Sequence, residues 1–123
     1  MKAKWKKAPP ELIARFDAAI AKLEGVVRKQ MFGYPCAFLN GNMLTGLFED
    51  NMMVRLSEKD RAKASLDAAA VPFAPAGRPM REYVVLPPEI VEDPRKLGAW
   101  LKRAVAYVGS LPKKKPKKAK PRS

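Results

Sequence analysis

The chain has 123 residues, 47% of them hydrophobic, which suffices for one folded core but not for two independent ones. Its formal charge of +13 lies mostly at the ends: residues 1–7 and 111–123 hold four and seven Lys/Arg without an acid, which leaves +2 on residues 8–110. With one cysteine, no histidine and no long apolar run, the composition excludes an internal disulfide and a histidine-ligated metal site. We expect a cytoplasmic, membrane-free protein that needs no cofactor.

The first predicted element is an amphipathic helix between Pro10 and Gly25. Proline is favoured in the first helical turn, and glycine commonly follows the last one. Apolar residues recur between them at three- and four-residue steps and form one stripe: Leu12, Ile13, Phe16, Ala19, Ile20 and Leu23.

Short apolar runs separated by turn residues follow, and they predict an antiparallel meander. One strand ends at Met31-Phe32-Gly33, and the next is Cys36–Leu39. Asn40-Gly41 is the strongest hairpin signal, because both residues tolerate the positive φ of a type I′ turn. Further strands are predicted at residues 43–48 and 52–56, with a turn at residues 49–51.

The second half combines helices, a loop and one more strand. Ser57 is a candidate N-cap for a short helix through about Ala69, with Ala62, Leu66 and Ala69 facing inward. Four turn residues between 72 and 79 predict an irregular loop, and residues 82–86 predict the last strand. Asp93-Pro94 then starts a helix that Gly109 ends. Its apolar stripe is Leu97, Trp100, Leu101, Ala104, Val105 and Val108.

These elements predict an α+β fold in two layers, an antiparallel sheet of about five strands packed against N- and C-terminal helices. We divide the chain into a flexible basic N-terminus (1–9), a folded domain (10–111) and a disordered Lys/Pro-rich tail (112–123). No catalytic constellation is present, because nucleophile–histidine pairs, phosphate loops and calcium loops are all missing from the sequence. We therefore expect a protein that is not an enzyme.

Several segments together resemble the N-terminal domain of the TfoX/Sxy family, over roughly residues 10–111. They are Met31-Phe32-Gly33, the hairpin Asn40–Met43, the segment Gly77–Val84 and the helix from Asp93-Pro94 to Trp100. The family includes bacterial regulators of competence genes. The resemblance implies a two-layer domain with an antiparallel sheet, a link to transcription control and no known catalysis. Full-length regulators carry a second domain, in whose place this chain has a basic tail, and Tyr34 replaces a second small residue after Met-Phe-Gly.

Cys36 and the methionines each allow two interpretations. Cys36 is either a buried strand residue or a redox-sensitive thiol near Arg28 and Lys29. The methionines either fill the core or line an adaptable apolar groove; they are Met31, Met43, Met52, Met53 and Met80.

A binding cleft is predicted where the proline-rich loop meets the first hairpin, because functional residues concentrate on loops. Its border would combine arginine, aromatic and thioether groups: Met31, Phe32, Tyr34, Arg78, Met80, Arg81 and Tyr83. The arginines could equally be solvated loop residues.

The C-terminal segment predicts sequence-independent contact with nucleic acid. Seven cations alternate with prolines that keep the segment extended along a phosphate backbone: Lys113, Lys114, Lys115, Lys117, Lys118, Lys120 and Arg122. Contact by all seven would give a salt slope of about −6 in a plot of log K against log salt, and we expect a shallower value. The other interpretation is a solubilising tail.

Two functions remain open from the sequence. The favoured one is a binding module that contacts a protein in the transcription machinery and adds nucleic-acid affinity through its tail. The alternative is a small-molecule sensor or enzyme subunit that uses the cleft near Met31, Arg78 and Tyr83.

Overall fold

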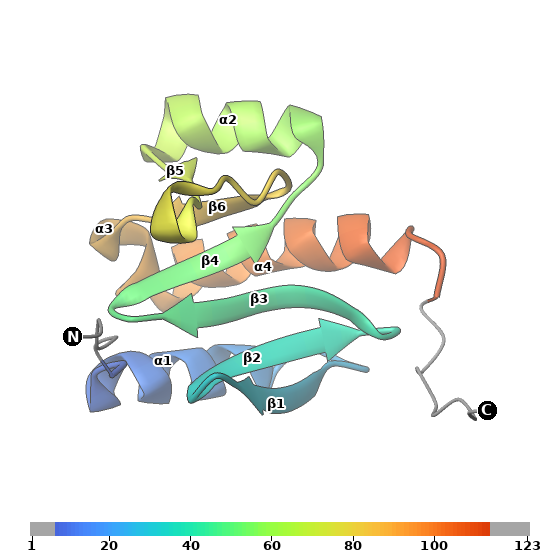
Figure 1. Cartoon of the computed structure of the whole chain (residues 1–123). Coiled ribbons are helices and arrows are strands. Elements are labelled where there is room, and N and C mark those ends of the chain that lie inside the picture. The colour runs from blue at the N-terminus through green and yellow to red at the C-terminus, as the bar shows by residue number, and fades with distance from the viewer. Residues whose placement is uncertain (1–6, 114–123) are drawn as a thin grey trace.

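A computed structural model of the chain describes residues 7–113, so most of the basic N-terminus and tail predicted above lies outside the described residues. The elements in chain order are α1 (Pro10–Ile20), β1 (Val27–Met31), β2 (Tyr34–Leu39), β3 (Asn42–Phe48), β4 (Asn51–Arg55), α2 (Glu58–Ala68), β5 (Val71–Pro72), the 3₁₀ turn η1 (Pro75–Gly77), β6 (Tyr83–Leu86), α3 (Pro88–Val91) and α4 (Pro94–Gly109) (Figure 1). The α+β class is confirmed.

The strands form one antiparallel sheet in the order β1-β2-β3-β4-β6-β5. Its first four strands are the predicted meander. β6 is the predicted last strand and pairs with β4. The sixth strand, β5, has only two residues and lies at the start of the segment predicted as an irregular loop.

Two tight hairpins flank β2, and both have the positive φ angles of a type I′ turn. Asn40 and Gly41 have φ of 55° and 82°, which confirms the predicted turn. Phe32 and Gly33 have nearly the same angles, 54° and 84°. The strand predicted to end at Gly33 therefore ends at Met31, and the following two residues make the turn.

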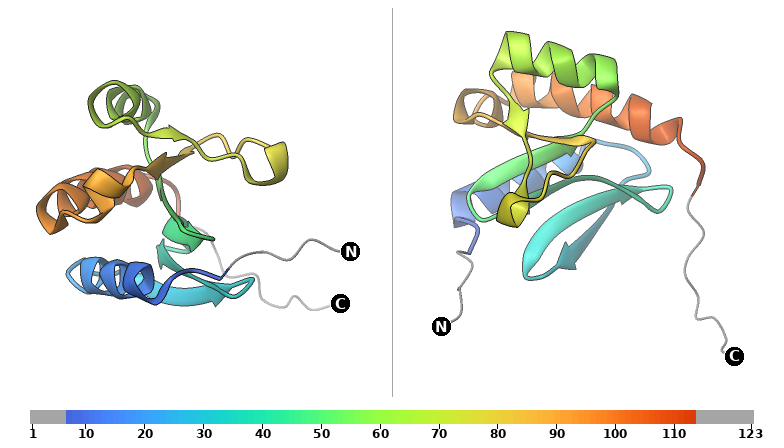
Figure 2. Two further views of the ribbon diagram at one scale, coloured as in Figure 1. Left: turned by 90° about the vertical axis from the view of Figure 1, so that its left-hand side faces the viewer. Right: turned by 45° about the horizontal axis from the view of Figure 1, so that its top comes forward.

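Helices α1 and α4 cover one face of the sheet, as Figure 2 shows from two further directions. Asp93 caps α4 as predicted: its Oδ1 accepts hydrogen bonds from the backbone N–H groups of Arg95 (3.0 Å) and Lys96 (3.2 Å). α1 begins at Pro10 as predicted but ends at Ile20, and Gly25 lies in the following turn with φ 78°.

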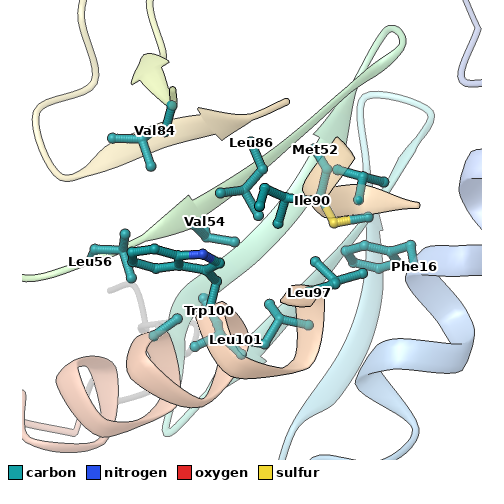
Figure 3. Packing of buried hydrophobic residues seen from close by; sticks show 14 of the residues in the cluster. Phe16, Met52, Val54, Leu56, Val84, Leu86, Ile90, Leu97, Trp100 and Leu101 are labelled. Carbon is teal, nitrogen blue, oxygen red and sulfur yellow. The ribbon is translucent and has the colours of Figure 1, made fainter. Parts of the chain in front are cut away.

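The hydrophobic core fills the space between this face and the helices (Figure 3). Strand residues that point toward the helices include Met52, Val54 and Leu86, and Trp100 and Leu101 of α4 meet them. Val108 and Ala104 are also buried, whereas Val105 is only half-buried. The predicted stripe of α4 is therefore its core-facing side.

The predicted inward face of α2 is wrong. Ala62 and Ala69 are exposed and Leu66 is 85% exposed, whereas the helix buries Ala64 and Ala68. Ser57 does cap the helix, since its hydroxyl accepts the N–H of Asp60 at 3.2 Å. The helix packs near β6 through alanines, which permit a close approach that a leucine would prevent.

Over residues 7–113, no helix is both long and apolar enough to cross a membrane.

Candidate binding pocket on the uncovered face of the sheet

The face of the sheet away from α1 and α4 contains a hollow at its centre. Cys36, Gly46 and Met53 are cross-strand neighbours there, because Cys36 pairs with Gly46 and Gly46 with Met53. Gly46 contributes no side chain, and a Cβ placed on it would lie 3.2 Å from both the Cys36 Cβ and the Met53 Cε. The missing side chain lets the side chains of Cys36 and Met53 lie close together above the strand.

This hollow is part of a pocket of about 180 Å³. The strands provide its floor, the β1–β2 hairpin one side, and the segment from Phe73 to Met80 its cover. In Figure 2 this segment lies on the opposite side of the sheet from α1 and α4. The lining residues are apolar or aromatic, with one thiol: Met31, Phe32, Tyr34, Cys36, Met43, Leu47, Phe48, Met53, Phe73, Pro75 and Met80.

Aromatic contacts connect the two sides of the pocket. The ring of Phe48 lies 5.5 Å from that of Tyr34 on β2 and 5.7 Å from that of Phe73 in the cover segment. These distances are typical of tilted and edge-to-face ring pairs. Backbone hydrogen bonds fix the cover, because the N–H of Met80 donates to the carbonyl of Phe73 (2.9 Å) and the N–H of Phe73 to that of Tyr83 (3.1 Å).

The rim of the pocket exposes large apolar side chains. Phe32 is 79% exposed, Met31 39% and Met80 37%. Met80 is distant in sequence from Met31 and Phe32 yet borders the same pocket. Apolar groups gathered around an apolar hollow are the usual mark of a surface that binds another molecule.

Four of the seven residues predicted to border a binding cleft lie together at this pocket. Met31, Phe32, Tyr34 and Met80 line the pocket. Arg78 and Arg81 flank Met80 on the cover segment but are exposed and do not line the pocket.

Tyr83 has a structural role beside the pocket and does not line it. Its hydroxyl donates a hydrogen bond of 3.1 Å to the carbonyl of Met43, and the guanidinium of Arg55 lies 5.6 Å from its ring centre. Burial raises the pKa of this hydroxyl, so it remains a protonated donor. Tyr83 therefore ties β6 to β3.

The methionines divide between the two interpretations. Met31, Met43, Met53 and Met80 line the pocket, as the groove interpretation requires. Met52 is 1% exposed and belongs to the core under α4. Strand alternation explains the difference between the adjacent Met52 and Met53, since neighbours on a strand point to opposite faces.

Cys36 is a buried thiol on the pocket floor, 3% exposed, with its Sγ 3.6 Å from the carbonyl of Lys29. Burial raises the pKa of the thiol, and the nearby charges of Arg28 and Lys29 oppose that rise only in part. A thiol with a raised pKa is a poor nucleophile. The structure supports the interpretation as a buried apolar residue.

A polar cluster that sequence reasoning missed closes the end of β4. Arg55 Nε donates to Glu82 Oε1 at 2.7 Å, and Glu82 also accepts a hydrogen bond from Tyr107 of α4. Partial burial opposes charge on Glu82, but the bonds from Arg55 and Tyr107 outweigh it and lower the pKa of the carboxyl. The cluster joins the pocket-side strands to the helix layer.

No described group suggests a metal site: among residues 7–113, no three Cys, Asp or Glu side chains converge. Of the seven tail cations predicted to contact nucleic acid, only Lys113 is described, and it is exposed. The preceding Pro112 accepts a hydrogen bond of 3.1 Å from Asn42 Nδ2, which anchors the start of the tail beside the β2–β3 turn. The other six predicted nucleic-acid contacts lie outside the described residues.

Pocket residues beyond the predicted ones come from two sources. Phe48 and Met53 lie on strands of the predicted meander, so their place at the pocket follows from strand alternation and register. Phe73 and Pro75 reach the pocket only because the cover segment folds over the sheet, and this segment contains only turn signals in its sequence.

The chain matches a known family. The family model of the TfoX N-terminal domain matches residues 18–108, and this range includes every residue that lines the pocket. Neither a search of curated proteins nor one of solved structures found a match.

Proposed function

Because the chain belongs to the TfoX N-terminal domain family, we propose that it is a non-enzymatic binding module of transcription control. Its pocket receives one apolar side chain of a protein partner, and its basic C-terminal segment adds sequence-independent affinity for nucleic acid. The observation that carries the proposal is the apolar pocket with its exposed apolar rim on the uncovered face of the sheet.

The size and lining of the pocket favour a protein side chain over a free metabolite. Sites for drug-sized ligands enclose about 300–1,000 Å³ and contain polar groups that orient the ligand. This pocket encloses about 180 Å³ and presents almost no polar groups. A cavity of about 150 Å³ accommodates one benzene ring. The space therefore suits a single side chain better than a sensor's metabolite or a cofactor.

The conformation of Phe32 supports a binding role for the rim. A bulky residue with positive φ is disfavoured, and such strain costs on the order of 1–3 kcal/mol. Phe32 has φ 54° and gains little burial there, since its side chain is 79% exposed. The equivalent position of the next turn is Asn40, a residue that tolerates this conformation. Phe32 thus keeps a disfavoured backbone conformation while most of its ring stays exposed at the pocket rim, which supports a binding role for the rim.

A Phe32→Asn substitution tests this role. It gives the first hairpin the same turn residues as the second, so we expect the free energy of unfolding to rise by about 0.5–1 kcal/mol. Binding of an apolar-anchored peptide, measured by isothermal titration, should weaken. The reverse change, Asn40→Phe, should lower stability and leave binding intact. A Phe32→Asn protein that is less stable and binds equally well would contradict the proposal.

The basic segment is tested by replacing its last six cations (Lys114, Lys115, Lys117, Lys118, Lys120 and Arg122) with glutamine, which keeps its length. The intact chain should bind duplex DNA with a salt slope shallower than about −6 and no preference for sequence. The glutamine variant should lose retention at moderate salt while its folding is unchanged. Unaltered DNA binding by that variant would remove the nucleic-acid part of the proposal and leave the pocket part standing.

The two contacts would use different ends of β2. Phe32 lies at the turn before this strand, and the basic segment begins near Asn42, after the turn that follows it. Phe32→Asn should therefore leave DNA affinity unchanged.

A further inference from the structure

The proposed function does not specify the chemistry of the partner segment, but the pocket lining and the arginines next to it favour one kind of segment. Resting on that function, we propose that the segment bound by the pocket is acidic and aromatic: one aromatic side chain enters the pocket, and carboxylates beside it pair with Arg78 and Arg81.

The aromatic preference follows from the lining. Sulfur groups of four methionines and one cysteine surround the pocket, although the whole chain has only six methionines and one cysteine. Thioether sulfur makes favourable contacts with aromatic ring edges, at about 0.3–1.5 kcal/mol each. Phe32, Tyr34, Phe48 and Phe73 add ring edges and faces. Such a lining favours a flat, polarisable ring over a branched aliphatic side chain of similar size.

The acidic preference follows from the arginines of the cover segment. Arg78 and Arg81 are exposed and lie two residues before and one residue after the pocket-lining Met80. Within residues 7–113, neither guanidinium has a hydrogen bond or ion pair. By contrast, five other arginines bond to a carboxylate or a carbonyl: Arg15, Arg28, Arg55, Arg61 and Arg103.

The nearest acid in sequence does not satisfy these arginines. Glu82 follows Arg81 directly, but its carboxylate is bound to Arg55 and Tyr107. The backbone holds the segment in place, since the N–H of Arg78 donates to the carbonyl of Pro75 at 3.0 Å and that of Tyr83 to the carbonyl of Met80 at 2.9 Å. Arg78 and Arg81 are therefore two cations beside the pocket rim that have no carboxylate partner among the described residues. Guanidinium groups favour carboxylate partners.

Charge also excludes one occupant from the chain itself. The C-terminal segment 112–123 carries seven cations and no aromatic residue, so it would meet like charge at Arg78 and Arg81 and bring no ring. A segment of opposite charge on another protein fits both features.

The test uses the full-length chain and three synthetic peptides of equal length. The first has one tryptophan flanked on each side by aspartate and glutamate, the second replaces the acids with asparagine and glutamine, and the third keeps the acids but replaces tryptophan with alanine. Binding is measured by isothermal titration at low and at physiological salt. The first peptide should bind about three- to tenfold more tightly than the second, an advantage that shrinks as salt rises. The third should bind most weakly.

Matched charge variants separate a local effect from the general attraction of a basic protein. Arg78→Gln with Arg81→Gln should remove the advantage of the acidic peptide. Arg95→Gln with Lys96→Gln removes the same charge from exposed positions on α4 and should change each Kd less than about twofold. All four side chains are exposed, so folding should be preserved, and circular dichroism checks it.

The outcomes distinguish this inference from the proposed function. Equal binding of the acidic and neutral tryptophan peptides, or equal losses in the two double variants, would overturn the acidic preference while the pocket function stands. Binding of the alanine peptide as tight as that of the acidic tryptophan peptide would overturn the aromatic preference. Failure of both tryptophan peptides to bind, or tryptophan binding unaffected by Met31→Gln at the rim, would overturn the pocket function as well.

Discussion

The two faces of the sheet are built from the same strands but differ in what covers them. On one face, α1 and α4 fill the space with large side chains such as Phe16 and Leu101, each 1% exposed. On the other, the loop segment 73–80 covers a floor that includes Cys36 and Met53, and a pocket of about 180 Å³ remains. The helical face therefore supplies most of the buried core, and the loop-covered face carries the surface that we propose for binding.

The largest expected effect is the contrast between Leu101→Ala and Met80→Ala. Leu101→Ala leaves a cavity in a filled core and should lower the free energy of unfolding by about 2–5 kcal/mol. Met80 is already partly solvated and borders a hollow, so its truncation should cost less than about 1 kcal/mol. Urea denaturation of both variants provides the measurement. Similar losses of unfolding free energy in the two variants would show that the loop-covered face contributes as much to stability as the helical face.

Gly46→Ala sharpens the comparison from the pocket side. The new Cβ would lie 3.2 Å from both the Cys36 Cβ and the Met53 Cε. The Cys36 Cβ cannot easily move, because it is attached directly to the backbone of β2. We expect a loss of about 1–3 kcal/mol together with weaker peptide binding, because the added methyl group would displace Cys36 and Met53, which line the pocket. Gly98→Ala is the control on α4: nothing lies within 4 Å of its Cβ position, so it should stabilise the helix by about 0.5–1 kcal/mol. A stabilised Gly46→Ala protein would show that the floor is not crowded.

Cys36 gives a smaller, pH-dependent effect on the same floor. Burial raises the pKa of its thiol in the folded state above the ordinary cysteine value of about 9. The folded state therefore holds the proton more tightly, and this contribution to stability is present below the unfolded pKa and is lost as pH rises through the folded value. Cys36→Ala should reduce the fall in unfolding free energy above about pH 9.

Thiol labelling checks the same site independently. At about pH 8 the folded protein should react with a disulfide reagent at least about tenfold more slowly than the unfolded protein. Equal rates would show that the pocket floor is open to solvent and that the thiol is available for redox chemistry.

The smallest expected effect on stability is at Leu66 of α2, a helix that belongs neither to the α1/α4 layer nor to the pocket. Leu66 is 85% exposed, so Leu66→Gln should change stability by less than about 0.5 kcal/mol. Ala64 is fully buried on the same helix, and Ala64→Gln should cost several times more, because a long polar side chain has no room there. Thermal unfolding of the pair provides the measurement. A larger loss at Leu66 would restore the face predicted from the sequence.

Local sequence signals determined much of this protein. The Asn40-Gly41 turn, the Ser57 and Asp93 caps and the apolar stripe of α4 depend on the chemistry of adjacent residues or on helical periodicity, and the structure bears them out. Met31, Phe32, Tyr34 and Met80 were also identified, because they lie on or beside the first turn and the proline-rich loop, and functional residues concentrate on loops.

Tertiary contacts decided the rest. Which side of α2 faces inward depends on how closely β6 allows the helix to approach, and its weak apolar pattern does not specify this. The pocket requires that strand register bring Cys36, Gly46 and Met53 together and that residues 73–80 fold back over them. The different roles of Arg81, Glu82 and Tyr83, one at the rim and two within hydrogen-bonded contacts, depend on partners 27–40 residues away in the chain. Local sequence patterns do not specify these contacts, because the contacts join residues that are far apart in the chain and form only once the whole sheet has folded.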